Sequence, residues 1–136
     1  MLKTAEERTG WRDEGISRRR RMWGWDCPAV DIDFLALEYD TGKPVALIEY
    51  KNEHAQPIRL GHPSARALKT LADSAGLPLF FVRCTDDFSR YYLTPANEKA
   101  KQLFAAPDWL SEKKWIEFLY RCRGREVPDE LSEQLV

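Results

Sequence analysis

DIDFLALEYDTGKPVALIEYK, residues 31–51, contains two apolar runs on either side of a turn. We predict strands over residues 31–39 and 45–51, because each run is dense in aliphatic and aromatic side chains. Residues 40–44, Asp-Thr-Gly-Lys-Pro, have the composition of a tight turn. The two strands are therefore expected to form an antiparallel hairpin.

Three ionisable side chains share one face of this hairpin if side chains alternate along each strand. With the turn centred on Gly42, Asp33 pairs with Lys51 and Leu35 pairs with Glu49. That register places Asp33, Glu49 and Lys51 on the same face, with the two acids as diagonal neighbours about 7–8 Å apart. A slip of one residue would separate the acids onto opposite faces.

The two carboxylates lie on an otherwise apolar face, where they repel each other and are costly to desolvate. Lys51 offsets part of this cost, and a divalent cation bound by carboxylate oxygens would offset the rest. Such an ion polarises a phosphate and lowers the pKa of a bound water, and a lysine beside it orients or deprotonates that water. The three residues therefore indicate metal-assisted phosphodiester hydrolysis. A cross-strand ion pair near a sheet edge is the alternative interpretation.

The pattern resembles the PD-(D/E)xK nuclease superfamily over residues 10–95, because an aspartate opens one strand and I-E-Y-K, residues 48–51, lies in the next. The resemblance implies an α/β (α+β), restriction-endonuclease-like or Holliday-junction-resolvase-like core, with a mixed sheet flanked by helices. It also implies that Asp33 and Glu49 bind Mg²⁺, with Mn²⁺ as a substitute. Lys51 would position the nucleophilic water.

The identity of the metal-binding aspartate is open at this stage. The literal Pro-Asp of the family motif is absent, since Pro28 is followed by Ala29, with Asp31 and Asp33 beyond. Either aspartate is therefore a candidate ligand. We prefer Asp33, because the apolar strand follows it directly.

Charged residues before the hairpin supply further candidates. The first helix of the family often adds a catalytic glutamate, for which Glu14 is the best match, with Glu6 and Glu7 as competitors. A surface pair between Glu14 and Arg18 is the alternative role. His54, shortly after the second strand, is a predicted DNA contact. Four consecutive arginines are also predicted DNA contacts, because arginine binds phosphates well. The alternative is that they lie at the solvent-exposed end of a helix, where positive charge is favoured. These residues are Arg18, Arg19, Arg20 and Arg21.

The remaining elements are predicted from hydrophobic spacing and helix-capping residues. A polar helix is expected over residues 3–22, and an amphipathic helix runs from Ser64 to Ala75 and is ended by Gly76. Other predicted elements are strands at 79–84 and 91–94 and helices at 96–105, opened by Pro95, and 111–122, capped by Ser111. The order α-β-β-α-β-β-α-α favours one domain over residues 1–136, with its core at 10–95, a helical part at 96–122 and a polar tail at 124–136.

Composition narrows the class of protein. The 136 residues carry 21 Lys plus Arg against 22 Asp plus Glu, a net charge of −1, which argues against coating nucleic acid by bulk electrostatics. Three widely spaced cysteines favour neither a disulfide framework nor a zinc site. The sequence contains no apolar run of about 18 residues and no signal peptide. We therefore expect a cytoplasmic protein without a membrane segment.

The predicted function is a Mg²⁺-dependent, endonuclease-like phosphodiesterase that acts on DNA, with RNA as an open alternative and a homodimer as one expected form. The first alternative is a catalytically inactive PD-(D/E)xK-like module that binds nucleic acid or a protein. The second is a small structural subunit whose final helical region forms an interface through its aromatic residues, Trp109, Trp115, Phe118 and Tyr120.

Overall fold

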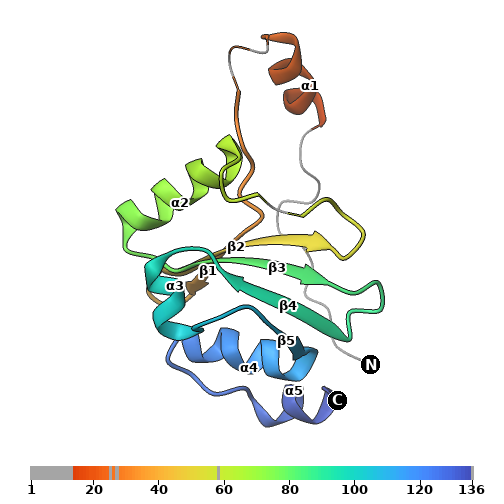
Figure 1. Cartoon of the computed structure of the whole chain (residues 1–136). Coiled ribbons are helices and arrows are strands. Elements are labelled where there is room, and N and C mark those ends of the chain that lie inside the picture. The colour runs from red at the N-terminus through yellow and green to blue at the C-terminus, as the bar shows by residue number, and fades with distance from the viewer. Residues whose placement is uncertain (1–13, 25, 27, 58, 136) are drawn as a thin grey trace. The chain divides into compact units, whose positions relative to one another are not determined.

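We describe residues 14–24, 26, 28–57 and 59–135 of a computed structural model of the chain (Figure 1). The chain divides into two units, Met1–Asp31 and Ile32–Val136, and each is described by itself. The first unit contains α1 (Glu14–Met22), with basic residues in its last turn. None of the described helices is long and apolar enough to cross a bilayer. The prediction of one domain over the whole chain stays a prediction.

The second unit is built on an open five-stranded sheet with the strand order β1-β2-β3-β4-β5. β2 and β3 run parallel, whereas the other neighbouring strands run antiparallel. The predicted mixed sheet with a crossover helix is therefore confirmed. The strands are β1 (Phe34–Glu38), β2 (Lys43–Asn52), β3 (Leu79–Cys84), β4 (Arg90–Pro95) and β5 (Asp108–Ser111).

Helices cover both faces of this sheet (Figure 1). α2 (Pro63–Ala75) connects β2 to β3 and packs on one face, while α3 (Glu98–Leu103) and α4 (Glu112–Cys122) pack on the other. A short helix, α5 (Asp129–Gln134), follows α4. The predicted flanking of the sheet by helices is thus confirmed for the second unit.

Two apolar cores follow from the alternation of side chains along β2 and β3. Leu47 and Phe81 join Leu68 of α2 in one core, whereas Ile48 and Phe80 join Trp115 of α4 in the other. Both central strands therefore read as nearly continuous apolar runs, as expected for strands that are buried on both faces.

β1 differs from the prediction in its length and its burial. The strand covers five residues rather than 31–39, and its apolar side chains Phe34, Leu35 and Leu37 are exposed. The helices therefore do not bury both faces of β1. β1 is exposed because it lies at the edge of the sheet, and the helices pack mainly over β2, β3 and β4.

The hairpin register also differs from the prediction. Leu35 lies opposite Leu47 rather than Glu49, a shift of two residues towards the turn. The turn is tighter than predicted, because Glu38 already pairs with Lys43, and a β-bulge then takes back one residue of the shift, because the ladder pairs Leu37 with Pro44 but Ala36 with Ala46. Val45 is the extra residue of the bulge, and such an insertion has no clear sequence signal.

Helix ends were predicted with mixed success. Gly76 ends α2 with a φ of +70°, and Ser111 accepts a hydrogen bond from the Lys114 N–H as the N-cap of α4, both as predicted. Ser64 is not the cap of α2, because His62 precedes it and accepts a hydrogen bond from the Ser64 N–H. Asn97, rather than Pro95, opens α3.

β5 and α5 were not predicted. β5 has only four residues, one of which is Trp109, assigned to the final helical region in the sequence analysis. Its residues pair with β4, and the Arg90 guanidinium lies 4.5 Å from the centre of the Trp109 ring. α5 lies in the segment that was predicted as a polar tail. Tertiary contacts of this kind cannot be read from local sequence.

Candidate metal-binding acid site

The β-bulge places Asp33 and Glu49 on the same face of the sheet. Beyond the bulge, Phe34 lies opposite Ile48, and the Phe34 ring packs against Tyr50 with centroids 5.1 Å apart. Asp33 and Glu49 therefore project to the other face, which carries α2. Without the extra residue, the register near the turn would continue and would send the two acids to opposite faces.

Asp33 is fixed by the backbone of β2. Its Oδ2 accepts a hydrogen bond from the Tyr50 N–H at 3.1 Å. A carboxylate that accepts a backbone hydrogen bond has a defined position without a long-range salt bridge.

Glu49 is the buried member of the site. Its side chain is 14% exposed, and Oε1 lies 3.7 Å from Nζ of Lys51. Oε2 is buried and accepts no hydrogen bond from the part of the chain that the structure describes. Burial, followed by the negative charge of Asp33, raises the pKa of Glu49, while the Lys51 charge opposes this rise. The carboxylate is therefore short of positive charge.

Lys51 links the buried acid to solvent. Its side chain is only about half covered, although it lies on the same face as Glu49. The residues packed around the acids are largely apolar, and Ile32, Leu68 and Leu79 are among them. The acids therefore lie in low-dielectric surroundings, with the Lys51 ammonium group at their solvent-exposed side.

The donor set fits a hard divalent cation. Asp33 and Glu49 present carboxylate oxygens, which Mg²⁺ and Mn²⁺ prefer, and Oε2 of Glu49 is a buried acceptor without a protein donor. A bound cation would satisfy that oxygen and would offset the repulsion between the two acids. The residues present therefore fit the metal that the resemblance implies.

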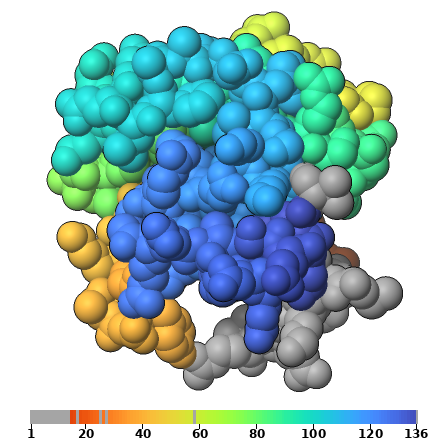
Figure 2. Space-filling model, turned by 90° about the horizontal axis from the view of Figure 1, so that it is seen from below, coloured from red at the N-terminus to blue at the C-terminus, as the bar shows by residue number. Residues whose placement is uncertain are grey.

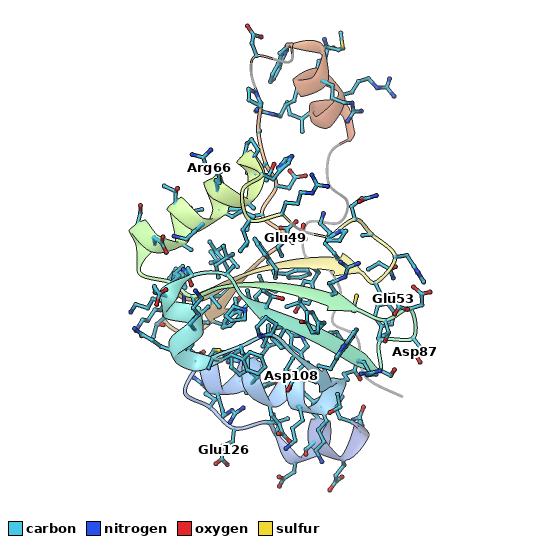
Figure 3. All side chains as sticks on the ribbon, viewed as in Figure 1. Glu49, Glu53, Arg66, Asp87, Asp108 and Glu126 are labelled. Carbon is cyan, nitrogen blue, oxygen red and sulfur yellow. The ribbon has the colours of Figure 1, made fainter. Side chains whose placement is uncertain are left out.

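A second group of ligand-type side chains lies at the ends of β2 and β3. Carboxylate and imidazole atoms of Glu53, His54 and Asp86 lie within 4.8 Å of one another. Figure 3 shows Glu53 at these strand ends, whereas Glu49 lies between the sheet and α2. Neither Glu53 nor Asp86 was predicted as a site residue. The predicted strand–helix–strand crossover could have indicated them, because neighbouring parallel strands end at the same edge of a sheet and bring the residues after them together.

This second group is exposed and internally paired. His54, which is 71% exposed, contacts Asp86 through Nε2 at 2.9 Å. Asp86 also accepts a hydrogen bond from Asn52, and its N–H donates to Glu53. The hydrogen bond from Asn52, followed by that from His54, lowers the pKa of Asp86. The acids of this group already have partners, in contrast to Glu49.

Arg83 holds the loop that carries His54. Its Nη2 donates to the carbonyl oxygens of Glu53 and Ala55, each at 2.7 Å. These bonds satisfy carbonyls of a turn that have no strand partner. The predicted DNA contact of His54 stays a prediction, and the structure places this residue against Asp86.

The other predicted site residues belong to the first unit. Glu14 begins α1, but its side chain lies outside what the structure describes, as do Glu6 and Glu7. Asp31 ends this unit. The proposed roles of these residues stay predictions, as do those of the arginine run, whose members are all exposed: Arg18, Arg19, Arg20 and Arg21.

Comparisons with known proteins return no match: no family model fits the chain, and no curated protein or solved structure resembles it significantly. The argument for function therefore rests on the residues and geometry of the acid site.

Proposed function

We propose that the chain is a metal-dependent nuclease that hydrolyses DNA phosphodiester bonds, with a restriction-endonuclease-like core of the PD-(D/E)xK type. The observation that carries this proposal is Oε2 of Glu49, a buried acceptor without a donor beside a second carboxylate. A protein gains no stability from such an arrangement alone. A bound cation would offset the negative charge of the two carboxylates and would explain why they lie together.

Each residue of the acid site has a distinct role in this proposal. Asp33 and Glu49 would hold Mg²⁺, which when bound supplies charge stabilisation to the phosphate oxygens. The hydrogen bond from the Tyr50 N–H keeps Asp33 oriented before substrate arrives. Lys51, whose ammonium group reaches solvent, orients the attacking water, and its neutral amine form would accept the proton of that water.

The arrangement of strands also supports the proposal. Asp33 precedes an antiparallel strand, Glu49 and Lys51 lie on the next strand, and a helix then leads to a parallel strand. The same order of strands and crossover helix was predicted from the sequence. The catalytically inactive module is the competing function, and it predicts DNA binding without cleavage.

The test is cleavage of plasmid and branched DNA in Mg²⁺ or Mn²⁺ by wild type, Lys51→Ala and Asp33→Asn. The matched control is Lys69→Ala, because Lys69 is a similarly exposed lysine that pairs with Asp73 on α2. We expect both site variants to lose at least about a hundredfold in rate, and the control to retain activity. Equal cutting by all four proteins would contradict the assignment. DNA binding without cutting by wild type would support the inactive module.

A further inference from the structure

A row of basic and aromatic side chains crosses four strands of the sheet and begins at the acid site. The strand register places Lys51 opposite Arg83, Arg83 opposite Tyr92, and Tyr92 opposite Trp109. Their sequence neighbours point into the core on the α4 side, so all four project to the face that carries α2. With strands about 4.8 Å apart, this basic–aromatic row is ~14 Å long.

The outer end of the basic–aromatic row is open to solvent. Trp109 is 39% exposed, and Arg90, two residues before Tyr92 on β4, is exposed as well. The core beneath α2 takes its strand residues from β2 and β3, so this helix leaves the β4 and β5 side of the face accessible. The other face of the sheet is covered by α4, which Figure 2 shows in blue.

The aromatic end of the row presents flat groups that suit a nucleobase. The Tyr92 and Trp109 rings have their centres 5.1 Å apart, and the Arg90 guanidinium lies 4.5 Å from the centre of the Trp109 ring. Aromatic rings and guanidinium planes both stack on unpaired bases. The N–H groups of the same guanidinium also bind phosphate. One end of the row can therefore hold both parts of a nucleotide.

The arginines of this surface carry charge that no protein carboxylate balances. Among the described residues, the Arg90 guanidinium contacts the Trp109 ring and forms no ion pair. Arg83 donates to two carbonyl oxygens, which leave its positive charge in place. The acids in the turn before β4 accept hydrogen bonds from other groups: Asn52 and His54 for Asp86, and Thr85 and Ser89 for Asp87. The surface is therefore complementary to the negative charge of a phosphate backbone.

We propose that the basic–aromatic row binds a single-stranded segment of the DNA substrate. Bases stack on Trp109 and Arg90, and the charges of Arg83 and Arg90 hold the phosphates. The segment is single-stranded because the bases of a duplex already stack on one another and offer no free face to a side chain. The row leads to Lys51, so the bound strand runs towards the acid site. The form of the substrate rests on the proposed nuclease function, whereas binding of the strand does not.

Binding of a short labelled oligothymidine, measured by fluorescence anisotropy in a chelator, tests the surface without cleavage. Trp109→Leu keeps an apolar side chain on β5 but removes the stacking plane, and Arg90→Ala removes the guanidinium. We expect each variant to weaken binding at least about fivefold. Trp109→Phe, which keeps a ring, should stay within about threefold of wild type.

Two matched controls lie elsewhere on the molecule. Tyr39 is a 73% exposed aromatic residue that follows β1, at the opposite edge of the sheet. Arg121 is an exposed arginine on α4 that also lies over a ring, 6.0 Å from the centre of Phe118. Tyr39→Ala and Arg121→Ala should bind within about twofold of wild type, as expected of surface positions outside the row.

The form of the ligand tests the stacking itself. Oligothymidine and a duplex with a single-stranded tail should bind more tightly than a blunt duplex or an abasic strand of the same length. Equal affinity for the abasic strand, or unchanged affinity in Trp109→Leu with native circular dichroism, would overturn the proposal. Strand binding by a wild type that cleaves no DNA in Mg²⁺ would refute the nuclease function and leave the binding surface in place. Cleavage with unchanged binding in Trp109→Leu would refute the surface alone.

Discussion

The acid site around Glu49 and the cluster around Asp86 contain similar chemical groups, but they differ in burial and in hydrogen bonding. Each has two carboxylates and one basic side chain. Glu49 is largely buried, and one of its oxygens has no donor among the described residues. Asp86 is exposed and accepts hydrogen bonds from Asn52 and His54.

The pKa shifts of the two acids have opposite signs for this reason. Burial and the Asp33 charge raise the pKa of Glu49, whereas hydrogen bonds lower that of Asp86. A carboxylate that already has protein donors gains little from a cation, but an unpaired buried carboxylate gains a great deal. We therefore choose the candidate metal site by burial and missing hydrogen-bond donors rather than by the number of nearby ligand atoms.

The largest expected difference concerns catalysis. Glu49→Gln should reduce the rate of DNA cleavage by at least about a hundredfold, because it removes a charged ligand that stabilises the transition state. Asp86→Asn should change the rate by less than about threefold, a small effect expected of an exposed residue outside the reacting groups. Single-turnover cleavage of a labelled duplex measures both variants. A larger loss for Asp86→Asn than for Glu49→Gln would reverse the assignment.

The same pair of variants should differ in the sign of their effect on stability. Without divalent ions at neutral pH, Glu49→Gln should raise the free energy of unfolding by about 1 kcal/mol, since it removes a buried charge that Lys51 offsets only in part. Asp86→Asn should lower the melting temperature slightly, because it replaces a carboxylate that accepts two side-chain hydrogen bonds. Urea and thermal unfolding in a chelator provide the measurement. Destabilisation by Glu49→Gln would contradict the account of its burial.

The smallest expected effects appear in the pH dependence of unfolding. The folded state raises the pKa of Glu49, so the metal-free protein should lose stability as the pH rises from the usual range of a glutamate through this raised value. The Asp86 contribution has the opposite sign. It is present above the usual aspartate pKa and is lost as the pH falls through the lowered value. The measurement is the urea midpoint of unfolding across a range of pH. The loss of stability with rising pH should disappear in Glu49→Gln, and the loss with falling pH should disappear in Asp86→Asn.

The sequence predicted the acid site better than its surroundings. Alternation along two strands predicted Asp33, Glu49 and Lys51 on one face, and the two acids share a face in the structure because the bulge at Val45 restores an even shift of the register. The exact pairing was wrong, because the turn is tighter than predicted and the bulge depends on how the strands twist and pack.

The missed features depend on contacts between distant segments. Glu53 and Asp86 come together only because β2 and β3 run parallel, with Asn52 opposite Cys84. β5 exists because its backbone pairs with β4, and a four-residue strand has too weak a local pattern to be predicted. Exposure of β1 likewise follows from the strand order rather than from its composition.

Binding of Mn²⁺ to the metal-free protein, measured by isothermal titration calorimetry, tests most directly whether the Glu49 site holds a cation. Wild type and Asp86→Asn should bind the ion with similar affinity, whereas Glu49→Gln should bind at least about tenfold more weakly. Unchanged affinity in Glu49→Gln, together with lost binding in Asp86→Asn, would assign the cation to the exposed cluster and contradict the proposed active site.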